Sequence, residues 1–488
     1  MQLKLFQLNR NKKISLLFND LKFFIKNFVE DKNTKIFTKY ISKNLEIPVD
    51  TLQKEFKIIL FKNFENLHGR FNKKFKFKNI FFSSMEYFLL TFYIYFFSNK
   101  DKLKSKRYDV IIDDIDRDNS PKRFFSLKNF CKIAFVCSDK KYKGNFFILF
   151  DSWKSCSKKI SFVGHPNKIF KIFFITLYYS FKTSNNFFPI VIDFVKTISK
   201  YETIFRKTYS DFLIQERHYN TSELKNYIFK KFKGKQSCVT QKNILQMNGP
   251  GMYVHADIFF ALGRKTADYL EDFEGEAKKI IPVGSLAMEY NYYKRKDINK
   301  TSTFDLLVFA SDHNKIFHSG YNSYYDEYIK HFDWVKKFSL HYPNFKIGIK
   351  LKSVITDEKV IKKFEQIKNV TFLFDKKELS DSYYFAHNAK AICTWSSTLA
   401  FEFLGSGRIV YFIDPGLRNI SFLPNDNYIK KFKISKYQEF DNKILLQINK
   451  PKLRFYKNKI LQENFCLNSA NVTKKILQSL KSFNKNDL

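Results

Sequence analysis

The chain has 488 residues, and its 86 Lys and Arg against 47 Asp and Glu give a net charge of +39 at neutral pH. At roughly 150 residues per domain, this length predicts two or three domains. A hydrophobic fraction of 44% excludes disorder for most of the chain, and six Cys without a CxxC pair exclude a small disulfide scaffold and are typical of reduced cytosolic thiols.

The positive charge is unevenly distributed. Lys accounts for 74 of the 86 cations, whereas surfaces that read phosphates and bases favour Arg, so codon supply in an AT-rich genome explains much of the excess. Residues 1–250 nevertheless carry a net charge of +27, residues 251–400 only +3, and residues 401–488 +9. Codon supply acts on every segment alike, so the asymmetry predicts that the first half meets an anionic partner.

Residues 1–104 are predicted to be a helical N-terminal region. The start of the chain has no long apolar segment, so we expect no secretory signal, and the longest apolar run (87–97) is shorter than the roughly 20 residues of a membrane span. Residues 88–97 fit either a buried core helix or an interfacial helix.

Residues 105–290 contain short β-rich runs separated by helical stretches, which predicts a parallel α/β domain. The expected strands are 108–114, 132–138, 159–165, 210–216, 242–248, 256–263 and 278–285. The polar run 291–303 is expected to be a linker. A second alternation follows in residues 304–436, with expected strands at 304–310, 344–351, 370–374, 389–395 and 408–414. Residues 437–488 return to helix. The predicted fold class is α/β, with two doubly wound Rossmann-like domains and a helical N-terminal extension.

The segment CTWSSTLAFEFLGSG (393–407) offers the first candidate site. Ser396, Ser397 and Thr398 lie between a strand and a helix, where a hydroxyl can cap the helix and the free N–H groups can bind phosphate. Glu402 follows Thr398 by one turn and could accept both ribose hydroxyls of a nucleotide. The alternative is an ordinary helix cap followed by a surface Glu.

The order of strand, hydroxyl cluster, helical Glu and following strand resembles the donor-binding segment of two-Rossmann (GT-B) glycosyltransferases of bacterial surface-polysaccharide synthesis. It also resembles the glycerophosphotransferases of teichoic-acid synthesis. Residues 245–290, which end in Val283-Gly284-Ser285 before the linker, are similar to the corresponding stretch of those enzymes. Where those enzymes often have Gln-His-Gly, this chain has Gln246-Met247-Asn248-Gly249, so the His is missing. Trp395 stands where the glycerophosphotransferases usually have an Asp, so a sugar-nucleotide donor fits better than a glycerophosphate donor.

The resemblance implies further donor-site residues. Ser311, Gly284 and Ser285 are expected in loops that line the interdomain cleft. Lys350 and Lys352 alternate at the end of a predicted strand, so they share one side and could face a donor diphosphate. The alternative for this pair is two solvated lysines in a Lys-rich chain.

A catalytic base is expected in the first domain, because sugar transfer requires deprotonation of the acceptor hydroxyl. Glu216 and His218 directly follow the strand 210–216 and are the best candidates, the alternative being a surface turn. Asp114 and Asp116 form an Asp-x-Asp pattern that could bind a divalent metal, but the two-domain pattern fits metal-independent enzymes better. We expect no metal and no cofactor beyond the nucleotide-sugar co-substrate.

The sequence therefore predicts a cytoplasmic glycosyltransferase that moves a sugar from a nucleotide-sugar donor to a cell-surface polysaccharide or lipid-linked acceptor. Attachment to the surface of the inner membrane is an option, because the basic half would meet anionic lipid. The alternatives are a CDP-glycerol-type glycerophosphotransferase and a basic nucleic-acid-binding protein, although no interleaved patch of Arg and aromatic residues supports the latter.

Overall fold

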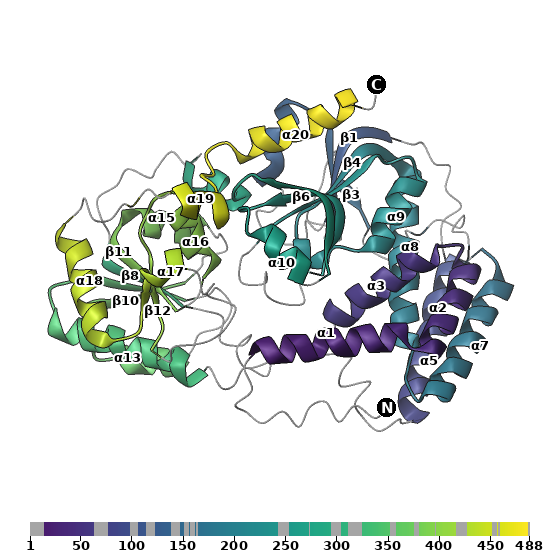
Figure 1. Cartoon of the computed structure of the whole chain (residues 1–488), viewed down its shortest axis with the longest axis horizontal. Helices are drawn as coiled ribbons and strands as arrows, with labels where there is room; N and C mark the ends of the chain where they lie inside the picture. Colours follow the sequence, from purple (N-terminus) through teal and green to yellow (C-terminus); the bar gives the residue numbers. More distant parts are fainter. Residues whose placement is uncertain are drawn as a thin grey trace.

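The computed structural model describes most of the chain. The described residues are 14–62, 77–97, 106–113, 123–137, 147–150, 156, 162, 164–242, 253–272, 274–293, 304–310, 325–351, 358–374, 380–395, 397–415, 427–450, 456 and 459–486. Two parallel sheets and a group of N-terminal helices make up the molecule (Figure 1).

The first sheet has seven parallel strands in the order β3-β2-β1-β4-β5-β6-β7. Its strands are β1 (Lys106–Asp113), β2 (Ile133–Cys137), β3 (Phe147–Leu149), β4 (Thr208–Gln215), β5 (Gln236–Thr240), β6 (His255–Ala261) and β7 (Glu276–Pro282). Five of the expected strands overlap these elements. The expected strand 159–165 lies mostly outside the described residues, and within it Phe162 and Gly164 lie in turns. The expected strand 242–248 likewise falls almost entirely outside them, and β5 lies just before it.

The second sheet has six parallel strands in the order β10-β9-β8-β11-β12-β13. They are β8 (Phe304–Phe309), β9 (Ile347–Lys350), β10 (Val370–Leu373), β11 (Ala389–Thr394), β12 (Tyr411–Ile413) and β13 (Lys433–Ile434). The five strands expected from the apolar runs are confirmed, and β13 was not expected. Together the two sheets confirm the predicted fold class.

Helices and short helical turns connect the strands. In the first half these are α1 (Ile14–Glu30), α2 (Lys32–Leu45), α3 (Val49–Lys62), α5 (Phe77–Phe97), η1 (Phe125–Asn129), α7 (Pro166–Thr183), α8 (Phe188–Lys207), η3 (His218–Asn220), α9 (Glu223–Lys231), α10 (Thr266–Asp272), α11 (Leu286–Met288) and η5 (Glu289–Tyr293). In the second half they are α13 (Tyr325–His341), α14 (Glu358–Phe364), α15 (Ser380–Asn388), α16 (Thr398–Gly405), α17 (Asn427–Lys430), α18 (Tyr437–Asn449), α19 (Lys459–Asn464) and α20 (Val472–Asn486). Most of the expected linker, residues 294–303, lies outside the described residues.

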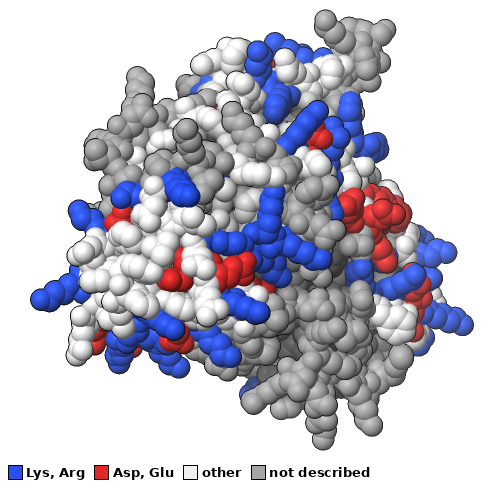
Figure 2. All heavy atoms as spheres, turned by 60° about the vertical axis from the view of Figure 1, so that its left-hand side comes forward, with Lys and Arg blue, Asp and Glu red and all other residues white. Residues whose placement is uncertain are grey.

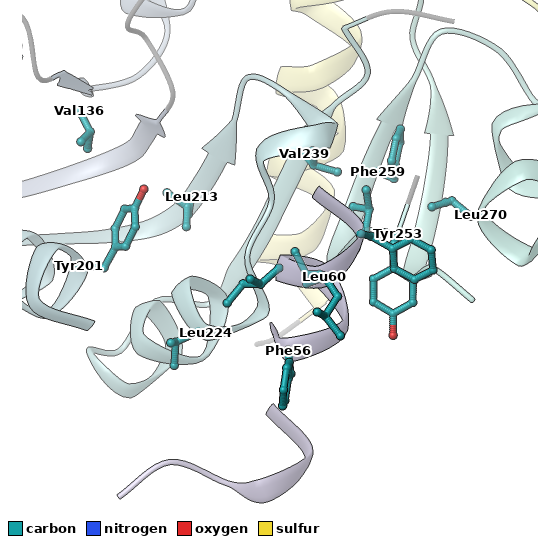
Figure 3. Close-up of a cluster of buried hydrophobic side chains, with 14 of the residues drawn as sticks. Phe56, Leu60, Val136, Tyr201, Leu213, Leu224, Val239, Tyr253, Phe259 and Leu270 are labelled. Carbon is teal, nitrogen blue, oxygen red and sulfur yellow. The ribbon is translucent and has the colours of Figure 1, made fainter. Parts of the chain in front are cut away.

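The N-terminal helices share a hydrophobic core with the first sheet. Phe56 and Leu60 of α3 lie near Leu224 of α9 and Tyr253 (Figure 3), and all four belong to one connected cluster of buried side chains. The buried carboxylate of Glu55 accepts the N–H of Leu224 at 3.0 Å, so α3 also fixes the start of α9. These helices are therefore integrated with the first domain.

The C-terminal helices divide between the two domains. The buried side chains of α18 join the core of the second sheet, whereas Val472, Ile476 and Leu480 of α20 pack in the core of the first sheet. In Figure 1, α19 lies between the two sheets and α20 crosses over the first. The described part of residues 437–488 contains the helices α18, α19 and α20, as expected, but α20 belongs in space to the first domain.

Candidate active site

Each sheet has one point at which the strand order reverses. In the first sheet it lies between β1 and β4, and in the second between β8 and β11. Parallel doubly wound sheets bind ligands at the carboxyl ends of the strands at such points, because the connecting loops diverge there. The residues that follow β1, β4, β8 and β11 are therefore the ones to compare with the predicted site.

The predicted hydroxyl cluster lies at the reversal point of the second sheet. Ser397 follows β11 and caps α16, since its Oγ accepts the N–H of Leu399 at 3.3 Å. Ser397 and Thr398 are both half-buried, and Ser396 lies outside the described residues. The helix cap expected from the sequence is confirmed, and it places the start of α16 at the carboxyl edge of the sheet. Phosphate binding there remains a prediction.

Glu402 lies inside the molecule, with a side chain only 4% exposed, so the alternative of a surface Glu is wrong. Its two carboxylate oxygens accept the hydroxyls of Ser285 at 2.5 Å and of Tyr383 at 2.7 Å. Burial raises the pKa of Glu402, while the two hydroxyls and the nearby Arg123 guanidinium oppose that rise. Each oxygen is thus already occupied by a protein hydroxyl, and contact with a ribose remains a prediction.

The loop after β7, with Gly284 and Ser285, contacts residues 467–469, the segment that leads from α19 back to α20. The N–H of Ser285 donates to Ser469 Oγ at 2.9 Å. Gly284 has φ +97°, and a Cβ at this position would lie 2.9 Å from the carbonyl oxygen of Leu467, so only glycine fits. Ser285 thus contacts both Glu402 of the second domain and Ser469 of the segment that leads back from that domain. Gly284 and Ser285 are both buried.

The predicted diphosphate-binding lysines are only partly described. Lys350 ends β9 and is 3% exposed, with its Nζ donating to the carbonyl oxygen of Leu351 at 3.2 Å. The alternative of a solvated lysine is therefore wrong for this residue. Lys352 and Ser311 lie outside the described residues, so the expected pairing of the two lysines stays a prediction.

Glu216 lies at the reversal point of the first sheet, directly after β4. Its carboxylate is 4% exposed and lies near three cations, with Oε1 3.4 Å from Arg123 Nη1 and 3.7 Å from Lys242 Nζ, and Oε2 3.3 Å from Arg217 Nε. A small cavity of about 20 Å³ is lined by Arg123, Glu216, Lys242 and Ser285 among others. The alternative of an exposed surface turn is wrong, because Glu216 and its two arginines are buried.

His218 lies in η3 and is fully buried. Its Nδ1 accepts the backbone N–H of Lys242 at 3.2 Å, so in the neutral ring the proton is on Nε2. The imidazole therefore positions the Lys242 backbone next to Glu216, and Glu216 is the one of the two predicted bases that lines the cavity.

A buried ion pair lies next to the residues around Glu216. Lys225 Nζ lies 2.7 Å from Asp113 Oδ2 at the end of β1, and the hydroxyl of Tyr201 donates to the same oxygen at 2.6 Å. Burial alone would raise the pKa of Asp113, but the charges of Lys225 and Lys200 hold it below its usual range. The carbonyl oxygen of Asp113 accepts the N–H of Glu216, so the pair fixes the loop that carries the candidate base.

Four residues of this site were missed in the sequence, namely Arg123, Arg217, Lys242 and Tyr383. None of them lies in a recognisable motif, and Arg123 is 93 residues from Glu216 in the chain. One signal was available for Arg217, because only 12 of the 86 cations are Arg and this one lies two residues after the end of β4.

Metal binding has no support among the described residues, where no group of three or more His, Cys, Asp and Glu could hold an ion. Asp114 and Asp116 lie outside them. All six cysteines are free, and five are buried.

No protein-family model matches the chain, and no curated protein matches it. Among solved structures, a UDP-GlcNAc 2-epimerase from Neisseria meningitidis bound to UDP-GlcNAc is 11% identical and has a TM-score of 0.47, with 77% of this chain and 100% of that chain covered. The MnaA–UDP structure from S. aureus is 12% identical with a TM-score of 0.47, covering 77% of this chain and 97% of that one. A variant of the wall teichoic acid polymerase TagF is 9% identical with a TM-score of 0.46, covering 90% and 99%.

These similarities are too weak to support an argument about ligands. The architecture is established by the two sheets themselves, and by the contact of Ser285, which follows β7, with Glu402 on the helix that follows β11. The chain therefore has a GT-B-like fold of two Rossmann-like domains, joined where the carboxyl edge of the first sheet meets α16 of the second domain.

Proposed function

We propose that the protein is a glycosyltransferase that uses a nucleotide-sugar donor and a cell-surface polysaccharide or lipid-linked acceptor. The observation that carries the proposal is the contact between the two domains at Ser285 and Glu402, which brings the candidate groups of the first domain close to α16. Transfer between two bound substrates requires such an arrangement, since each domain can hold one of them.

In this proposal the donor phosphates bind at the start of α16, where Ser397 and Thr398 lie. A helix N-terminus presents unpaired N–H groups to an anion and carries a partial positive charge. Ser397 and Thr398 are half-buried, which leaves part of each accessible. Lys350 ends β9, which β8 separates from β11 in the sheet, and it would add a positive charge at the same carboxyl edge.

The acceptor hydroxyl would be activated in the first domain by Glu216. In the reaction the acceptor oxygen forms a bond to the anomeric carbon, the bond from that carbon to the donor phosphate breaks, and the nucleoside diphosphate leaves. Glu216 would take the acceptor proton, while Arg123 and Lys242 hold its carboxylate in place. We propose that no metal takes part, and that the protein acts in the cytoplasm at the inner face of the membrane.

Saturation-transfer NMR with UDP, GDP, CDP and CMP tests the donor site. The doubly substituted Ser397→Ala/Thr398→Val protein should lose most of the signal, and Ser406→Ala at the other end of α16 is the matched control, because its hydroxyl bonds only within the helix. Loss of the cap costs about 1 kcal/mol, so circular dichroism should show that the double variant stays folded. The proposal fails if no nucleotide gives a signal with the wild-type protein.

A second candidate is a glycerophosphotransferase with a CDP-linked donor. The observation in its favour is the surplus of cations at the first reversal point, where Arg123, Arg217 and Lys242 surround one carboxylate and could attract a phosphate-bearing acceptor. Product mass separates the two reactions, because one adds a hexose and the other a phosphodiester.

Nucleic-acid binding has less support. On the face shown in Figure 2, Lys and Arg are spread among groups of Asp and Glu and do not form one block. A nucleic-acid site would give filter-binding affinity that falls steeply with salt.

A further inference from the structure

Helices α5 and α7 expose large apolar side chains on one side of the molecule. The members of this aromatic face are 41% to 67% exposed, and they are Phe77, Phe81, Phe82, Met85, Leu89, Phe96 and Phe97 on α5 and Phe170, Phe174, Tyr178 and Phe181 on α7. Apolar residues scattered singly over a surface are normal, whereas a contiguous group marks an interaction site.

The two helices form one continuous face. The rings of Phe77 and Phe181 are 6.1 Å apart between centroids, and those of Phe92 and Phe170 are 6.0 Å apart. The start of α5 therefore lies next to the end of α7, and the helices run antiparallel along their length. With 21 residues in α5, the face is about 30 Å long. Figure 1 shows both helices at the right-hand end of the molecule, on the far side from the second sheet.

The opposite side of α5 belongs to the protein core. Tyr87 is fully buried and its hydroxyl donates to the carbonyl oxygen of Ile169 at 2.9 Å, and Ile80 and Ile94 are also buried. By length and composition alone α5 could cross a membrane. Because its inner side packs against α7 and α8, it instead presents only one side to the surroundings.

The charges on this face are mainly positive. Lys78, Lys171 and Lys182 are exposed along the two helices, and Lys78 and Lys182 lie over the rings of Phe82 and Tyr178. The acidic residue on the exposed side of the two helices is Glu86, which is paired with Lys196 at 3.2 Å. A surface of aromatic rings and lysines without free carboxylates is complementary to anionic lipid headgroups.

We propose that this aromatic face binds the surface of an anionic lipid bilayer, with α5 and α7 lying in the plane of the interface. The rings would enter the boundary between headgroups and acyl chains, and the three lysines would contact lipid phosphates. A second copy of the chain fits less well, because a symmetric contact would bring the same lysines against each other. The inference does not depend on the transferase reaction, but it would bring a lipid-linked acceptor to the first domain.

Co-sedimentation of the full chain with vesicles tests the proposal without any nucleotide, so the result is separate from that of the donor-site experiment. Vesicles of phosphatidylcholine with phosphatidylglycerol should bind the protein at least about tenfold more strongly than vesicles of phosphatidylcholine alone, and added salt should weaken binding. The Phe82→Ser/Phe174→Ser protein should lose at least about tenfold in partition coefficient. Phe130→Ser is the matched control, because Phe130 and Phe174 are both 62% exposed and Phe130 lies outside the face.

Three results would overturn the proposal. The first is wild-type protein that binds neither kind of vesicle. The second is a Phe130→Ser control whose partition coefficient falls as much as that of the Phe82→Ser/Phe174→Ser protein. The third is a dimer, detected by light scattering without lipid, that the Phe82→Ser/Phe174→Ser changes abolish, since the face would then belong to a second copy. Lys78→Glu/Lys182→Glu supplies an independent variant, in which binding to anionic vesicles should fall while binding to neutral vesicles stays the same.

Discussion

Glu402 offers the sharpest test of how the domains are held together. In Glu402→Ala the hydroxyls of Ser285 and Tyr383 lose their acceptor while remaining buried. At about 1–3 kcal/mol for each unsatisfied buried group, the free energy of unfolding should fall by about 2–6 kcal/mol. Glu402→Gln keeps the size and one acceptor oxygen, so it should be much less damaging. Glu439→Ala removes a half-exposed carboxylate from the pair with Lys443 and should cost no more than about 1 kcal/mol.

The pH dependence of stability gives a second readout. Burial raises the pKa of Glu402, so the folded chain binds this proton more tightly than the unfolded chain does. The stability that this group contributes is therefore fully present below the usual pKa of a glutamate and is lost as the pH rises through the raised value. Glutamine does not titrate, so the advantage of wild type over Glu402→Gln should shrink as the pH rises from the acid range.

Urea denaturation followed by tryptophan fluorescence, repeated over a pH series, measures both effects. Stability of Glu402→Ala equal to that of the Glu439→Ala control would refute the structural role. If the unfolding free energies of wild type and Glu402→Gln change with pH in the same way, burial does not raise the pKa of Glu402 as inferred. If Glu402 instead holds a ribose, Glu402→Gln should weaken the nucleotide NMR signal while leaving the unfolding free energy unchanged.

Two further predictions concern the packing around the site. Gly405→Ala should lower the free energy of unfolding by about 1–3 kcal/mol in urea titrations, because the new Cβ would clash with the backbone carbonyl oxygen of Cys466, which must shift. Gly348→Ala is the milder control, since the atoms nearest to its Cβ belong to the Phe304 ring and lie 3.0 Å away. Lys225→Met should cost about 3–5 kcal/mol at neutral pH, because it leaves the Asp113 carboxylate buried without its cation. Because the pKa of Asp113 is lowered in the folded chain, the stability that its ion pair contributes is lost as the pH falls. The difference in unfolding free energy between wild type and Lys225→Met should therefore become smaller in acid. A difference that does not change with pH would contradict this account.

The type and order of most elements could be predicted because they depend on local patterns. Runs such as FDLLVFA are apolar enough to form a buried strand wherever their neighbours lie, and β8 occupies most of this run. The cap at Ser397 is equally local, since the hydroxyl bonds an N–H two residues further along. The sequence also placed Glu216 at the end of its strand. Short segments with weaker patterns were missed, among them β3 and the two-residue strand β13.

By itself the sequence determined that the chain has two parallel α/β halves, that hydroxyls cap a helix after β11, and that an amphipathic helix closes the chain. Only the tertiary structure decided that Arg123 meets Glu216, that Ser285 meets Glu402 across 117 residues, and that α20 returns to the first sheet. The reason is physical. Hydrophobic periodicity indicates which face of a helix or strand must be buried, but the surface that covers this face depends on the packing of the whole chain. The buried carboxylates illustrate this, because their partners come from elements that are distant in sequence and adjacent only once both sheets have formed.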